Sequence, residues 1–233
     1  MTSYSGTGTA AGGPGGTTAG ELAAECRAVL GDAGETATWS DAELIGFLNE
    51  ALREVSQHLP RVGVVRLAAL AGTRRYALPG DTLAVLSVEY PEGREPASYL
   101  TRRPHKSRRF AGAAAAYDFL PRHDLTAAPG LLLSFDPAAG ETLAARITRP
   151  HAPVAAAADP LTVPADHHHV LVQYALFAAA RQLQAREQAS AAGNALLMGQ
   201  LAANVRRHEL SYLQALNRIL TQRQGESSVV AWG

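Results

Sequence analysis

The segment WSDAELIGFLNEALREVSQHLP, residues 39–60, decides the fold of the first part of the chain. Ser40 and Glu43 have the S-x-x-E spacing of a capping box, in which each side chain accepts a hydrogen bond from the other residue's backbone N–H. Trp39 precedes the cap, where it can act as a hydrophobic staple. Apolar residues then recur at helical spacing until Pro60: Leu44, Phe47, Leu48, Ala51, Leu52, Val55 and Leu59. The segment therefore predicts a capped amphipathic helix.

A shorter helix is predicted just before this segment, from Thr18 to Leu30, with Gly31 as its stop signal. Leu22, Cys26 and either Val29 or Leu30 would share its apolar face. Residues 1–20 contain seven glycines, five threonines and no charged residue. Such a composition buries too little apolar surface to offset backbone ordering, so we expect residues 1–17 to form a flexible arm.

After Pro60 the pattern changes to short apolar runs separated by Pro, Gly and Asp, which indicates strands and turns. The predicted strands are Val62–Leu70, Arg74–Leu78, Leu83–Tyr90, Tyr117–Leu120, Leu131–Phe135 and Leu143–Arg149. We expect residues 61–163 to form a small β-sandwich or open barrel inserted between helices.

The chain becomes helical again at Pro164, and residues 164–224 predict a hairpin of two helices that turns near Gly193. With the helices of residues 18–60 this hairpin makes a bundle of about four helices. The predicted fold class is α+β: mainly a helical bundle, with an inserted β-sandwich or barrel-like domain and extended termini.

Residues 225–233 form a short tail in which Val229, Val230 and Trp232 are the apolar anchors. Burying these three side chains contributes roughly 7 to 10 kcal/mol. Ordering nine residues costs on the order of 9 to 18 kcal/mol of backbone freedom. The tail therefore needs backbone hydrogen bonds from a partner to become ordered, for example by strand addition.

Charge is unevenly distributed along a chain whose formal net charge is zero. Residues 17–60 carry eight acids and two bases, and the remainder of the chain balances them with an excess of bases. A molecule with one acidic and one basic face can pack head-to-tail against its own copies. The alternative is that these charges are only solvated faces.

The known catalytic and metal-binding patterns are not matched, so we predict no catalytic residue, no metal site and no cofactor. The glycines of residues 6–11 have no preceding strand, and Lys106, the only lysine, does not follow a phosphate-binding glycine loop. His167, His168 and His169 are consecutive and would point about 100° apart on a helix. His208 and Glu209 lack the second histidine of a zinc protease. Cys26, the only cysteine, excludes an intramolecular disulfide and fits a reducing compartment.

The densest run of positive charge lies within residues 94–109. Its candidate contact residues are Arg102, Arg103, Lys106, Arg108 and Arg109. Arginine side chains bind phosphate oxygens irrespective of base sequence, so this loop could contact DNA. It could equally contact an acidic neighbouring subunit, or be a solvated loop.

Three stretches in a fixed order resemble the head-to-tail adaptor (connector or neck) proteins of tailed phages, of the short-tailed type. They are WSDAEL running into FLNEA at residues 39–51, YALPGD at residues 76–81, and VPAD leading into VLVQYAL at residues 163–176. The resemblance implies a virion structural protein that forms a dodecameric ring under the portal protein, joins the capsid to tail or nozzle proteins, and continues the channel for genomic DNA. It also implies that the C-terminal extension reaches the portal.

The competing hypothesis is a DNA-binding accessory or packaging protein that uses the Arg-rich loop. A third is a hydrolase whose site is assembled from distant residues. No stretch has the length of a membrane span and no secretory signal is present, so we expect host cytoplasm during assembly and the virion neck afterwards.

Overall fold

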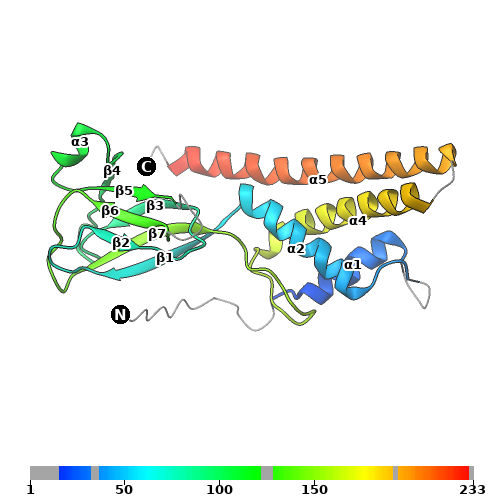
Figure 1. Cartoon of the computed structure of the whole chain (residues 1–233), viewed down its shortest axis with the longest axis horizontal. Coiled ribbons are helices and arrows are strands. Elements are labelled where there is room, and N and C mark those ends of the chain that lie inside the picture. Colours follow the sequence, from blue (N-terminus) through cyan, green and yellow to red (C-terminus); the bar gives the residue numbers. More distant parts are fainter. Residues whose placement is uncertain (1–15, 33–36, 122–127, 191–193, 231–233) are drawn as a thin grey trace. The chain divides into compact units, whose positions relative to one another are not determined.

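The computed structural model describes residues 16–32, 37–121, 128–190 and 194–230, except for the side chains of residues 223–230. The described residues form two compact units, which are considered separately below (Figure 1). The β unit is Pro60–Pro150, and the helical unit is the described chain before and after it. The α+β fold class is confirmed, with five helices and two small sheets in the described ranges.

The helical unit contains α1 (Ala19–Leu30), α2 (Asp41–His58), α4 (His168–Ser190) and α5 (Ala195–Val230). Both expected helix starts carry a complete capping box, formed by Thr18 with Glu21 and by Ser40 with Glu43. Gly31 ends α1 in the left-handed conformation, at φ 65°, which a residue without a Cβ adopts without strain. The local signals in the sequence therefore fix the ends of these two helices.

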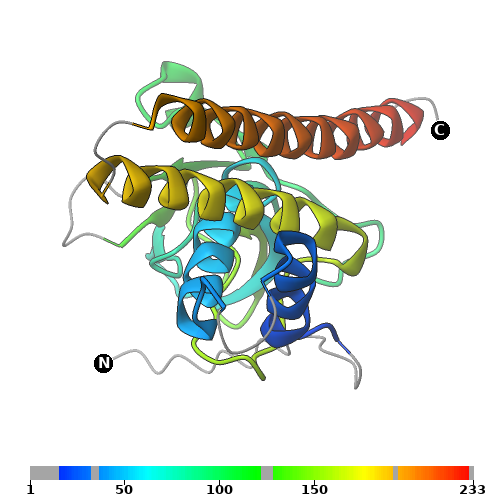
Figure 2. The same ribbon diagram turned by 90° about the vertical axis from the view of Figure 1, so that its right-hand side faces the viewer.

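Helix α4 lies at the centre of the helical unit, where it packs against α1, α2 and α5 (Figure 2). Because it has neighbours on several sides, its buried residues do not form a single stripe: Val170, Leu171, Val172, Ala175, Leu176, Ala178 and Ala179. Leu44, Leu48 and Leu52 of α2 are fully buried in the same core. Trp39 packs edge-to-face on Phe47, with ring centroids 5.2 Å apart.

The β unit consists of two sheets that share one core. The three-stranded sheet has the order β1 (Arg61–Ala68), β7 (Thr142–Arg149), β3 (Ala84–Glu89). The four-stranded sheet has the order β2 (Arg75–Ala77), β6 (Gly130–Leu133), β5 (Ala116–Leu120), β4 (Thr101–Arg102). All pairs are antiparallel except β4 with β5. Side chains from both sheets, such as Val88, Leu131 and Ile147, meet in one apolar cluster.

The boundary after the β unit differs from the expected one. Residues 151–163, which the sequence pattern places in the β insertion, belong to the helical unit instead. Asn49 of α2 donates to the carbonyl of Val154 and accepts from its N–H, both at 2.8 Å. The N–H of His151 donates to Ser56 Oγ at 2.8 Å. These long-range bonds leave no periodic signal in the sequence, which is why composition alone places the boundary too late.

The end of α5 is a second difference. The sequence predicts a helix that stops near Gln224 and an extended tail after it, but α5 continues to Val230. The extended conformation is therefore wrong for residues 225–230. The N-terminal arm expected at residues 1–17 lies outside the described residues up to residue 15.

Candidate functional site

The five candidate cationic residues lie along one edge of the four-stranded sheet, here called the basic edge: Arg102, Arg103, Lys106, Arg108 and Arg109. Arg102 belongs to β4, and Arg108 and Arg109 to the one-turn helix α3 (Arg108–Ala111). Four of the five side chains are exposed, and Arg103 is half-buried. The sequence predicts this segment as a loop because a two-residue strand and a single helical turn are too short to leave a periodic pattern.

The basic edge is held to strand β5 by backbone and side-chain contacts. The N–H of Arg103 donates to the carbonyl of Tyr117 at 2.9 Å. The N–H of His105 donates to Asp118 Oδ2 at 2.8 Å, and His105 Nδ1 lies 2.7 Å from the same oxygen. Phe110 is buried and anchors α3. The cationic side chains are therefore presented from an ordered backbone.

Among the described residues, none of the five cationic side chains of the basic edge forms an ion pair. Other arginines of the β unit do have partners. Arg66 Nε lies 2.6 Å from Glu92, Arg74 Nε lies 2.7 Å from Asp136, and Arg149 Nη2 lies 2.7 Å from Asp81. Burial raises the pKa of Tyr117, and the nearby charge of Arg102 acts in the opposite direction. Residues 60–150 carry thirteen bases and eight acids, so bases outnumber acids in this part of the sequence.

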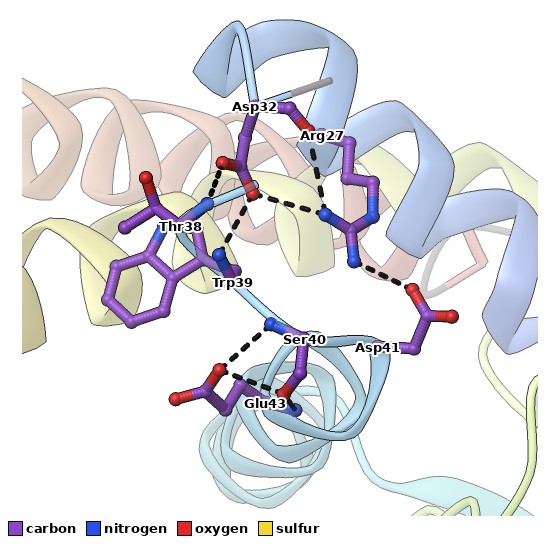
Figure 3. A network of polar contacts seen from close by, with 7 residues as sticks. All are labelled: Arg27, Asp32, Thr38, Trp39, Ser40, Asp41 and Glu43. Atoms are coloured by element: carbon purple, nitrogen blue, oxygen red, sulfur yellow. Dashed lines mark hydrogen bonds and ion pairs between the residues drawn. The ribbon is translucent and has the colours of Figure 1, made fainter. Parts of the chain in front are cut away.

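The acidic residues around α1 and α2 are largely used inside the helical unit (Figure 3). Asp32 is buried and accepts hydrogen bonds from the N–H groups of Thr38 and Trp39 and from Arg27 Nη1. Arg27 Nη2 also lies 2.7 Å from Asp41. The network joins the end of α1 to the start of α2.

Two further acids of α2 are paired with arginines of α4. Arg186 pairs with Glu43 and lies over the ring of Trp39, 4.5 Å from its centroid. Arg181 Nη2 lies 3.4 Å from Glu50. Much of the acidic excess of residues 17–60 is therefore not a free surface charge, although Glu25 is exposed without an ion pair among the described residues.

The candidate docking residues of the C-terminus are only partly described. Val229 and Val230 lie in the final turn of α5, and their side chains are outside the described part of the structure, as is the whole of Trp232. Helix α5 has 36 residues against 23 in α4. At 1.5 Å per residue it is longer by roughly 20 Å, so its C-terminal turns extend beyond the start of α4.

The three consecutive histidines contact different groups at the start of α4. His168 Nε2 lies 2.9 Å from the carbonyl of Val163, and His169 Nδ1 lies 3.0 Å from the carbonyl of Asp166. His167 Nε2 lies 3.5 Å from Asp166 Oδ2. Within the described ranges, no group of three His, Cys, Asp or Glu residues could hold a metal ion.

Two other potentially reactive side chains, Cys26 and His208, are shielded from solvent to different degrees. Cys26 is buried, and desolvation raises the pKa of its thiol to about 12. The pKa of His208 is lowered, first by desolvation and then by the neighbouring charge of Arg207. Among the described residues, neither has an activating partner of the kind that nucleophilic catalysis uses.

None of the described helices is both long and apolar enough to cross a membrane.

Of the comparisons with known proteins, the family match agrees with the resemblance noted in the sequence. No curated protein matches the chain. The model of the SU10 adaptor protein family matches residues 17–231, which spans both units. That family is structural and not enzymatic. The resemblance is thereby confirmed: the chain belongs to the SU10 adaptor protein family and is a phage adaptor, a component of the virion.

Proposed function

We propose that the chain forms a ring, a dodecamer by similarity to adaptors, that docks under the portal protein and connects the capsid to tail or nozzle proteins. The ring continues the channel through which genomic DNA passes. The observation that carries this proposal is that one adaptor family spans both units of the chain, from residue 17 to residue 231.

The C-terminal end of α5 is the proposed portal-docking element. Its last turns extend beyond α4, and they lead to the apolar residues Val229, Val230 and Trp232. Apolar side chains at a projecting chain end contribute binding energy once a partner buries them. The docking segment begins as a helix, so at least part of its ordering cost is met before the portal is bound.

Removing residues 225–233 tests this assignment. The truncated chain should remain folded by circular dichroism, because the last described buried residue of α5 is Ile219. It should fail to co-purify with particles that carry the portal, and electron microscopy should show rings under the portal only with the full chain. A finer variant replaces Val229, Val230 and Trp232 by Ser, with Ser227→Ala/Ser228→Ala as the matched control. Normal assembly of the triple variant would refute the docking role.

A second candidate function is a DNA-binding accessory or packaging protein that uses the basic edge. It is favoured by one observation: the five cations are presented from an ordered edge and lack ion-pair partners among the described residues. In the ring proposal the same residues would line the DNA channel or contact a neighbouring subunit. Binding of duplex DNA by the isolated chain would support the accessory role.

A further inference from the structure

Helix α5 carries a second apolar stripe on the side turned away from α4. Its core-facing residues include Leu201, Tyr212, Leu216 and Ile219. On the opposite side Leu196 and Leu210 are 74% and 49% exposed, and the exposed Ala203 lies midway between them. The seven-residue spacing places these three side chains in one line along the helix, as in the seam of a coiled coil. Leu213 extends the stripe and is 43% exposed.

Two arginines flank the stripe on α5. Arg206 and Arg207 lie between Ala203 and Leu210 in sequence, and both are exposed. On the helix surface, one arginine lies on each side of the line from Ala203 to Leu210. Arg207 Nη2 donates to Asn204 Oδ1 at 3.0 Å, and neither arginine forms an ion pair with a described residue. This surface, the α5 outer face, is therefore apolar along its centre with one cation on each side, and the exposed Glu209 lies further round the helix, beyond Leu213.

Helix α1 presents a surface of the opposite kind. Its residues Ala19, Leu22, Ala23 and Cys26 face the core. The other side has Glu21, Ala24, Glu25 and Ala28, which are all exposed and are spaced at i, i+3, i+4 and i+7. Glu21 Oε2 accepts the N–H of Thr18 in the capping box, whereas Glu25 has no ion pair within the described ranges. This α1 outer face combines small side chains with negative charge.

We propose that the α5 outer face of one copy packs on the α1 outer face of the next copy in the ring. The leucines of α5 fit over the small residues Ala24 and Ala28, and Arg206 and Arg207 pair with Glu25 and Glu21. This inference rests on the proposed ring, and it names the surfaces that build it.

The charges also disfavour the symmetric alternative. An α5 face paired with another α5 face sets Arg206 and Arg207 against like charges, and an α1 face paired with another α1 face does the same with Glu25. Within the helical unit, α4 lies between α5 and the pair of α1 and α2, so the two faces are separate surfaces of one body (Figure 2). A contact between two different surfaces is heterologous, and it repeats from copy to copy until the ring closes.

The test places one cysteine on each face, as Ala24→Cys and Ala203→Cys in the same full-length chain. Native Cys26 is buried and does not compete for reagent. Assembled particles are treated with a short bis-maleimide and analysed on a denaturing gel, with the two single variants as matched controls. The double variant should give a ladder of multimers, and each single variant should stay monomeric.

The outcomes separate this inference from the proposed function. If the chain is present in the particles but the double variant gives no ladder, the α1–α5 contact is refuted while the adaptor role stands. Dimers from the Ala203→Cys single variant would show a symmetric α5 contact and refute the inference as well. If the chain is missing from the particles, the ring proposal fails, and the ladder is then sought with concentrated purified chain, where its absence also refutes the contact. Charge reversal adds a second readout: Glu25→Arg and Arg206→Glu should each weaken the ladder, and together they should restore it.

Discussion

Two nitrogens of His105 are hydrogen-bonded to the same carboxylate oxygen of Asp118. The backbone N–H of His105 lies 2.8 Å from Asp118 Oδ2, and the ring Nδ1 lies 2.7 Å from it. Because a carboxylate only accepts hydrogen bonds, Nδ1 carries the proton in this pair. The pair fixes the middle of the basic edge on strand β5, between Arg103 and Arg108.

Replacing Asp118 by Ala should loosen the basic edge. The substitution removes two hydrogen bonds to a charged group that is only 9% exposed, so the free energy of unfolding should fall by about 1.5 to 3 kcal/mol. Backbone amide hydrogen exchange of residues 105–111 should become faster. Asp136→Ala, which breaks the exposed ion pair with Arg74, is the control and should leave that exchange unchanged. Equal exchange in both variants would contradict the anchoring role.

Replacing Asn49 by Ala should destabilise the helical unit through the segment after Pro150. The side chain of Asn49 satisfies both backbone groups of Val154, which is buried. Leaving them unpaired should cost about 2 to 4 kcal/mol, measured by urea unfolding. Asn217→Ala, on the exposed side of α5, should cost little. A loss no larger than that of the control would mean that residues 151–163 do not depend on α2.

The capping box of α2 predicts a loss of stability in acid. The pKa of Glu43 is lowered from 4.5 to about 2, first by the N–H of Ser40, then by its hydroxyl, then by Arg186. A carboxylate with a depressed pKa in the folded state contributes stability that is complete above its ordinary pKa of 4.5 and is lost as pH falls toward about 2. The melting temperature should therefore drop across this window.

The variant Glu43→Gln isolates this contribution. Its melting temperature should be lower than that of the native chain at neutral pH, and the difference should shrink as pH approaches about 2. Glu25→Gln is the control, because Glu25 is exposed and outside both capping boxes. A constant difference at every pH would count against the assignment.

Cys26 should react slowly with thiol reagents in the folded chain. Its pKa is raised from 9.0 to about 12, mainly by burial and then by the charge of Glu25. A rise of about three units leaves about a thousandfold less thiolate at neutral pH, and burial restricts access further. Reaction with a chromogenic disulfide should be fast only after unfolding, whereas the exposed Ala24→Cys should react at once. Rapid labelling of native Cys26 would show that α1 leaves the core.

The basic edge should determine any salt-dependent binding of DNA. A cation that pairs with one phosphate adds about 0.9 to the slope of log K against log salt concentration, so Arg108→Ala/Arg109→Ala should reduce the slope by about 2. Arg66→Ala/Arg74→Ala removes the same charge from residues already paired with Glu92 and Asp136 and should change the slope less. Titrations of duplex DNA at several salt concentrations measure both. An equal change would mean that only net charge matters.

Local sequence signals determined the helix starts and most of the strands. The capping box at Ser40, the stop at Gly31 and the apolar spacing of α2 each act within a few residues, so they can be recognised without a structure. The order of the three family-like stretches is equally visible, and the family match confirms the resemblance. The sequence also identifies the cationic residues of the basic edge, but it does not show that they lie along the edge of a sheet.

Only the tertiary structure decided where the β unit ends and how the acids are used. The bonds from Asn49 to Val154 and from Glu43 to Arg186 join residues more than a hundred positions apart, and no local pattern records such distances. The anchor from Asp118 to His105 links a strand to a segment that has almost no secondary structure of its own. Sequence periodicity reports which side of a helix or strand is apolar, whereas the partner of that side is chosen by packing of the whole chain.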